Sequence, residues 1–198
     1  MKRLVARLSI TQDDVSPTVR RTIDVPLELK LDRLHSVIQE AFLWSDTHLW
    51  EFTFGRTGFG IPDAAYGIGS PRDARRSTLG ETLRLLRGNS FSYVYDFGDA
   101  WHHSVTIVEI LHAQTGTTYP ALLEAIGSRP PEDCGGAHEY AEKLVALADT
   151  SHEDHEDAIE ALGYDYDPNR PASIEMINSG FAALRKRWSR RTAKSEKP

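Results

Sequence analysis

The sequence lacks the features of a secreted or membrane-spanning protein. Its single cysteine, Cys134, cannot form an internal disulfide, so a disulfide-stapled scaffold is excluded. No apolar run approaches the roughly 18 to 20 residues that a membrane span needs. The opening MKRLVARLSITQDD has no continuous apolar segment, because Arg3 and Arg7 interrupt it, which argues against a secretory signal. We therefore expect a cytoplasmic protein without a membrane partner.

Length and composition are those of one globular domain. The chain has 198 residues, of which 40% are hydrophobic and 26% are charged. We expect a single domain over residues 1–188 and a basic, flexible tail over residues 189–198.

The net charge of −6 is unevenly distributed. Residues 185–198 hold seven Lys or Arg against one Glu, whereas the first 184 residues hold 16 basic and 28 acidic side chains. Because so acidic a body repels a phosphate backbone, only residues 185–198 are expected to contact nucleic acid, and weakly.

Hydrophobic periodicity predicts strands first and helices last. Alternation over 4–10, the β-branched segment 18–26 and the aromatic segment 48–54 predict three strands, and spacings of three and four predict a helix over 31–43. Five glycines and two prolines between Gly55 and Pro71 indicate a long irregular loop. The runs FSYVYDF and WHHSVTIVEIL, separated by a glycine-containing turn, predict a β-hairpin.

The later segments are predicted to be helical. They comprise a short apolar helix at ALLEAIG (121–127) and helices over roughly 138–148, 153–163 and 173–188. The order predicts an α+β fold, in which an antiparallel or mixed sheet carries helices on one side and the last third is helical.

The hairpin around YDFGDAWHH holds the residues that look most suited to chemistry. Alternation places Trp101 and His103 on the apolar face and His102 on the other. His103 is thus either a core histidine or a pocket histidine suited to acid-base work or metal ligation. Asp96 and Asp99 are either turn formers or ligands.

A metal site is one alternative for these residues. Asp96, Asp99 and His103 are the candidate ligands, and the loop with Glu132, Asp133 and Cys134 would add others if it met the hairpin. Beyond such a divalent ion, no cofactor is predicted. Cys134 precedes two glycines and a helix start that would favour a nucleophilic thiolate, although the neighbouring carboxylate opposes it.

Three segments carry a family resemblance. LHSVIQEAFLWSDTHLWEF (34–52), YDFGDAWHHSVTIVE (95–109) and PPEDCGGAHEY (130–140), followed by the acidic HEDHEDAIEALGYDYDP, resemble the Ri-plasmid open-reading-frame-three-like family, whose members are often labelled transposon passenger TnpR. The resemblance implies a compact α+β fold of uncharacterised activity, found on plasmids and beside mobile elements. It singles out the following positions: His48, Asp96, Phe97, Gly98, Asp99, Trp101, His103, Pro131, Glu132, Asp133, Cys134, Gly135 and Gly136.

Two departures from the family pattern bear on metal binding. Ser128 and Arg129 stand where family members often have a second cysteine, and Trp50 stands where they often have a second histidine. The resemblance therefore implies neither a cysteine pair nor a dense histidine site in this chain.

Three functional hypotheses remain open, and the sequence leaves undecided whether the protein is an enzyme. The first is a binding module for a small molecule or a protein, with one pocket lined by His48, Asp96, Asp99, Trp101, His103, Glu132, Asp133, Cys134, Gly135 and Gly136. The second is a metal-assisted hydrolase or nuclease. The third is a mobile-element accessory protein that contacts DNA through residues 185–198.

Overall fold

The computed structural model describes residues 3–62 and 70–195, with side chains to residue 190. Within these residues the chain forms one eight-stranded sheet in the order β5-β4-β3-β6-β7-β1-β2-β8. The strands are β1 (Leu4–Gln12), β2 (Arg20–Pro26), β3 (Trp50–Phe54), β4 (Thr57–Gly60), β5 (Arg72–Asp73), β6 (Ser90–Tyr95), β7 (Trp101–His112) and β8 (Ala121–Ile126). Neighbours are antiparallel except β4 and β5, so the sheet is mixed.

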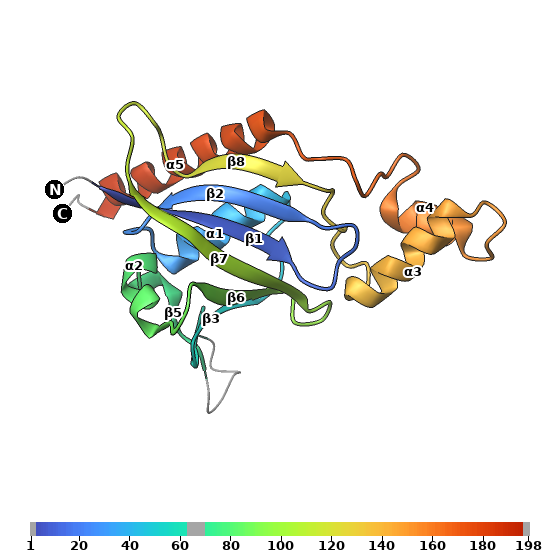
Figure 1. The fold of residues 1–198 in the computed structure, drawn as a ribbon, viewed down its shortest axis with the longest axis horizontal. Coiled ribbons are helices and arrows are strands. Elements are labelled where there is room, and N and C mark those ends of the chain that lie inside the picture. The colour runs from blue at the N-terminus through green and yellow to red at the C-terminus, as the bar shows by residue number, and fades with distance from the viewer. Residues whose placement is uncertain (1–2, 63–69, 196–198) are drawn as a thin grey trace.

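The helices are α1 (Leu31–Phe42), α2 (Leu79–Thr82), α3 (Gly136–Ala148), α4 (His155–Leu162) and α5 (Ile174–Ser195). In Figure 1, α1 lies behind the central strands and α5 behind β8, whereas α3 and α4 form a helical pair that projects from one end of the sheet. The expected α+β class is thereby confirmed. None of the helices among the described residues is both long and apolar enough to cross a membrane.

The prediction of a short helix at ALLEAIG is wrong, because this segment is the edge strand β8, which pairs with β2. Six residues are too few for periodicity to distinguish the two structures. The tertiary structure decides, since the Asn178 side chain on α5 both accepts a hydrogen bond from the Leu122 N–H, at 2.8 Å, and donates one to its carbonyl, at 3.0 Å.

Two other boundaries differ from the sequence prediction. The segment predicted as a loop from Gly55 to Pro71 contains β4, and its residues 63–69 lie outside the described part of the chain. Helix α5 continues to Ser195, although the last helix was expected to end near residue 188 and the tail to occupy residues 189–198.

The core face of the sheet is crossed by a row of aligned side chains. Gln12, His103, Tyr93 and Phe52 are successive cross-strand neighbours on β1, β7, β6 and β3. Because directly opposed residues share a face, all four point into the core, where they are buried. Alternation along β7 thus assigned the histidines correctly, with His103 inside and its neighbour in sequence exposed.

Candidate functional site

Three loops from distant parts of the sequence meet at one end of the sheet. They are the loop after α1 (43–49), the DFGD turn (96–99) and the PEDCGG loop (131–136). The Gly135 N–H donates to Asp99 Oδ2 at 3.2 Å, and Glu132 accepts hydrogen bonds from the Ser45 N–H at 2.9 Å and the Tyr95 hydroxyl at 2.6 Å. The hairpin and the PEDCGG loop are therefore in contact, and both lie against the loop after α1.

The DFGD turn owes its shape to its aspartates. Asp96 has a left-handed backbone, with φ of 57°, which Asp tolerates better than most residues. Its Oδ1 accepts a hydrogen bond from the Gly98 N–H at 2.9 Å, and its carbonyl accepts one from the Ala100 N–H at 2.7 Å. These bonds leave Oδ2 to face the neighbouring loop.

The PEDCGG loop approaches this turn so closely that a side chain is excluded at Gly136. Its φ is +80°, and a Cβ atom built there would lie 2.5 Å from the Asp99 carbonyl oxygen. Glycine is therefore required both for the backbone conformation and for the space.

His48 lies between two carboxylates at this junction. Its Nδ1 is 3.7 Å from Asp96 Oδ2, and its Nε2 is 3.2 Å from Asp133 Oδ1. One ligand atom from each of the three residues lies within 4.8 Å of the others. The Asp96 side chain is 11% exposed and the Asp133 side chain 76%, so the cluster has a fixed inner side and an open outer side. The Tyr95 ring meets the imidazole edge-on, with ring centroids 5.7 Å apart.

Glu132 holds the loops together rather than joining the cluster. Burial alone would raise the pKa of its carboxyl, but hydrogen bonds from Ser45 and Tyr95 outweigh that effect and hold the pKa below its ordinary value. The carboxylate is thus ionised at neutral pH and occupied by three donors, the Ser45 N–H, the Ser45 hydroxyl and the Tyr95 hydroxyl.

His103 and Trp101 belong to the core. The His103 ring packs edge-on against Phe42 and Trp44, with centroids 5.0 and 5.4 Å away, and is fully buried. Burial lowers the pKa of its imidazole to about 3, so the ring is neutral at physiological pH. Trp101 is 1% exposed. The sequence left open whether His103 is a core or a pocket histidine, and in the structure it is a core histidine.

Cys134 is also buried, at 4% exposure, and its surroundings disfavour the thiolate form. Burial, with the nearby Asp99 carboxylate, raises the pKa of this thiol to about 11. The residue is therefore a protonated core side chain at neutral pH, and thiolate chemistry is disfavoured.

Of the three metal-ligand candidates taken from the hairpin, only Asp96 belongs to the cluster. Asp99 binds the Gly135 N–H, and His103 lies in the aromatic core. His48 and Asp133 instead complete the set. The resemblance had singled out both residues, but no spacing in the sequence joined them to Asp96.

Sequence reasoning missed a buried polar network beside the site. His35 on α1 lies 2.8 Å through Nδ1 from the Tyr93 hydroxyl and 2.6 Å through Nε2 from Asp46 Oδ1, and its ring stacks on Trp50. Gln39 donates to the same hydroxyl at 3.1 Å and accepts from the Asp46 N–H. This network fastens the loop that carries His48 to α1. The one sequence signal for it is that His35 follows Leu34, a residue of the apolar face of the predicted helix, so that a buried histidine could have been expected.

A family model matches most of the chain. The model described as plasmid pRiA4b ORF-3-like protein matches residues 4–173, which include all three loops. The chain belongs to this family. The resemblance deduced from the three motifs is thereby confirmed.

Two relatives extend the comparison. This ORF-3-like chain is 44% identical over 188 residues to the uncharacterized protein y4hQ of Sinorhizobium fredii, covering 94% of this chain and 95% of that protein. Its fold is similar to the crystal structure of MM3350, a protein of unknown function from Methanosarcina mazei, with a TM-score of 0.78 and 29% identity over 88% of this chain and 98% of the other. The ORF-3-like assignment thus defines family and fold, whereas the function has to be inferred from the site.

Proposed function

We propose that this ORF-3-like protein is a binding module for a divalent transition-metal ion, held by His48, Asp96 and Asp133. The observation that carries the proposal is the convergence of one imidazole nitrogen and two carboxylate oxygens within 4.8 Å of one another. They come from three loops that hydrogen bonds hold together. Such a set suits a cation rather than a neutral ligand, because two of its three members are carboxylates, the hard oxygen donors that bind divalent ions.

The donor types favour a particular class of ion. Imidazole nitrogen suits zinc, copper, iron and nickel, whereas an all-oxygen site would suit magnesium or calcium. Donors of a tetrahedral zinc ion, at bond lengths of about 2.0 to 2.2 Å, lie roughly 3.4 Å apart. The ligand atoms of the cluster, which lie within 4.8 Å of one another, must therefore approach by as much as about 1.4 Å on binding. Asp133 is the residue able to move, since most of its side chain is exposed.

Replacing His48 by Ala is expected to weaken Zn²⁺ binding at least about 100-fold, because the substitution removes the nitrogen ligand of the cluster and even changes to residues behind the ligands cost 10- to 100-fold. Isothermal titration calorimetry on metal-free protein measures the effect, with Mg²⁺ as the ion expected to bind poorly. His138→Ala is the matched control, since His138 is an exposed histidine on α3 whose neighbour is Glu142. Equal affinities for wild type and His48→Ala would refute the proposal.

The second candidate function, metal-assisted hydrolysis, is favoured by the open outer side of the cluster. Three protein ligands leave a coordination position for water, as in catalytic zinc sites, and a bound ion lowers the pKa of that water. The 76% exposure of the Asp133 side chain supports an open coordination position on the solvent side of the cluster. Turnover of an activated phosphodiester by Zn²⁺-loaded protein, lost in Asp96→Asn, would support hydrolysis. Tight Zn²⁺ binding without turnover would leave the protein a binding module.

A further inference from the structure

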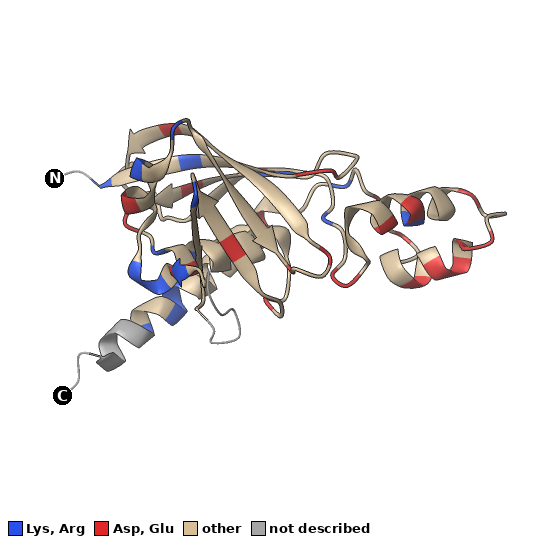
Figure 2. Ribbon diagram, turned by 90° about the horizontal axis from the view of Figure 1, so that it is seen from below, with Lys and Arg blue, Asp and Glu red and all other residues tan. Residues whose placement is uncertain are grey.

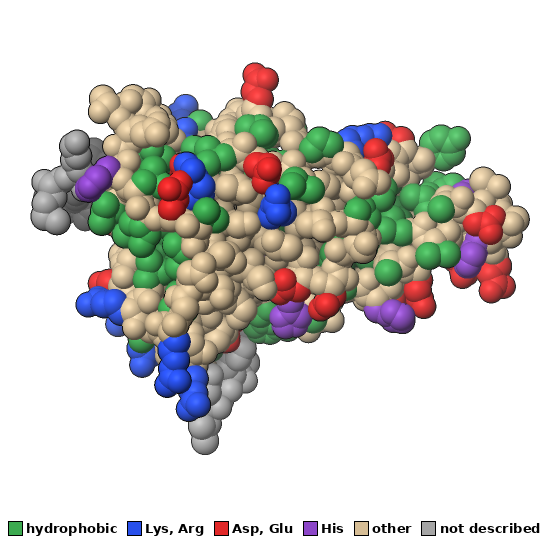
Figure 3. All heavy atoms as spheres, viewed as in Figure 1, with side chains coloured by type: hydrophobic (Ala, Val, Ile, Leu, Met, Phe, Trp, Pro, Cys, Tyr) green, Lys and Arg blue, Asp and Glu red, His purple; other side chains and the backbone are tan. Residues whose placement is uncertain are grey.

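Opposite charges gather at opposite ends of the molecule. The α3–α4 pair, residues 136–162, contains eight Asp or Glu and one Lys, whereas residues 185–195 of α5 contain six Lys or Arg and no acid. Figure 1 places the C-terminal end of α5 and the α3–α4 pair at the two ends of the longest axis. In the ribbon of Figure 2, red segments, which mark Asp and Glu, lie along the helical pair, and blue segments, which mark Lys and Arg, lie toward the opposite end of the molecule. In Figure 3 acidic and histidine side chains also cover the α3–α4 end. The molecule is thus strongly dipolar.

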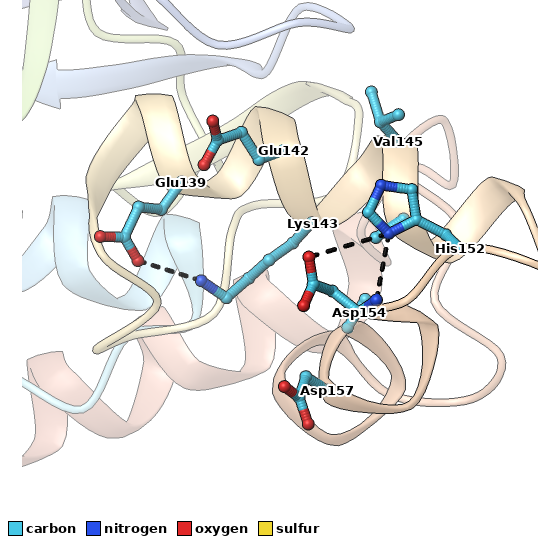
Figure 4. Close-up of a pocket in the computed structure, with 9 residues that line it drawn as sticks. Glu139, Glu142, Lys143, Val145, His152, Asp154 and Asp157 are labelled. Carbon is cyan, nitrogen blue, oxygen red and sulfur yellow. Dashed lines mark hydrogen bonds and ion pairs between the residues drawn. The ribbon is translucent and has the colours of Figure 1, made fainter.

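The acidic end carries a groove of about 540 Å³ between α3 and α4. Figure 4 shows Glu139, Glu142 and Asp157 around it, with Lys143 bound to the first of these. Val145, 63% exposed, adds an apolar contact. The groove therefore offers a cationic helix both a charged rim and a hydrophobic anchor.

The basic end presents its cations outward. Lys186, Arg187 and Arg190 are exposed on α5, whereas Arg185 donates to the Pro120 carbonyl and Arg33 lies over the Trp188 ring at 5.2 Å. These last contacts fix the start of the basic segment on the body. At 1.5 Å per residue, the 11 residues of 185–195 span about 16 Å and the 13 of α3 about 20 Å, so the lengths match.

We propose that the protein forms an antiparallel, two-fold symmetric dimer in which the basic end of α5, residues 185–195, docks in the α3–α4 groove of a second copy. Because the two surfaces lie at opposite ends of the long axis, an antiparallel pair makes both contacts at once and closes under two-fold symmetry. The inference is independent of the metal site.

A second copy fits the basic end better than a nucleic acid does. The 184 residues before the basic segment have 28 acidic and 16 basic side chains, so a phosphate polymer that extends along the body meets repulsion. A second copy instead supplies a matching local charge, −7 in residues 136–162 against +6 in residues 185–195. The same acidity that disfavours DNA therefore favours self-association.

Charge exchange tests the dimer. Sedimentation velocity is expected to show a wild-type dimer whose dissociation constant rises more than about tenfold between roughly 0.05 and 0.5 M NaCl, because salt screens the contact. Arg187→Glu with Arg190→Glu and, separately, Glu142→Lys with Asp157→Lys should each be monomeric. An equimolar mixture of the two variants should recover a 1:1 dimer, since both contacts become complementary again.

The control variant has the same change in net charge as the groove variant, but its substitutions lie outside the groove. Glu156→Lys with Glu160→Lys alters exposed residues of α4 that do not line the groove, and it should leave most of the dimer intact. A monomeric wild type at low salt, or a mixture that stays monomeric, overturns the proposal. The proposal is also overturned if Arg187→Glu with Arg190→Glu binds duplex DNA more weakly than the wild type but has the same sedimentation coefficient. Circular dichroism of each variant verifies that it is folded.

Discussion

Gly136→Ala is expected to lower the free energy of unfolding by about 3 kcal/mol, combining the strain of a left-handed backbone with a displaced loop. The new Cβ atom would meet the Asp99 carbonyl oxygen at 2.5 Å, and this oxygen belongs to a turn that cannot yield by rotating a side chain. The substitution should therefore push the PEDCGG loop away from the DFGD turn. Urea denaturation followed by circular dichroism measures the loss.

Gly116→Ala separates the two causes. Gly116 has φ of +82°, nearly the same as the +80° of Gly136, but nothing lies within 4 Å of a Cβ atom built there. Gly116→Ala should lower the free energy of unfolding by only about 1 kcal/mol, the cost of placing a side chain on a left-handed backbone. Equal losses for the two variants would mean that the close approach of the loops contributes nothing to stability.

A second large effect concerns pH. The pKa of His103 falls from 6.5 to about 3 through burial, so the folded protein keeps this ring neutral while the unfolded chain protonates it below pH 6.5. The unfolded state then binds more protons, and stability falls as pH drops from 6.5 toward 3. At pH 4 this single group is expected to cost about 3 kcal/mol relative to pH 7, at 1.36 kcal/mol for each pKa unit.

His103→Leu should remove that part of the acid sensitivity. Both ring nitrogens of His103 are buried without a hydrogen-bond partner among the described residues, so an apolar side chain of similar volume is also expected to be tolerated at neutral pH. Guanidinium unfolding of wild type and variant at pH 7 and pH 4 measures the difference. His102→Leu, on the exposed face of the same strand, should keep the wild-type pH dependence. Parallel pH profiles for wild type and His103→Leu would contradict the argument.

The periodicity of hydrophobic residues was enough to predict the strands and helices that bury one face. Alternation separated His103 from His102, and the spacing of Leu31, Leu34 and Val37 located α1, because in each case one face is buried. The same reasoning failed for ALLEAIG. That segment is a strand because β2 offers it an edge and α5 covers its outer side, neither of which is local.

The candidate site was only partly predictable for the same physical reason. His48, Asp96 and Asp133 are 48 and 37 residues apart along the chain, so no periodicity relates them. Their meeting depends on backbone conformations, such as the left-handed Asp96 and Asp133, that most residues avoid and that sequence spacing does not encode. The resemblance supplied the residues, and the structure supplies their distances.

The way the sheet ends has a consequence for how the protein avoids aggregation. At one edge, the Leu122 peptide groups that would template another strand are occupied by Asn178. At the other, β5 is two residues long, Arg72 and Asp73, both charged. Short, charged or covered edges discourage strand addition and domain swapping between crowded copies. Losing the Asn178 side chain would therefore free both Leu122 peptide groups for pairing with a strand of another copy.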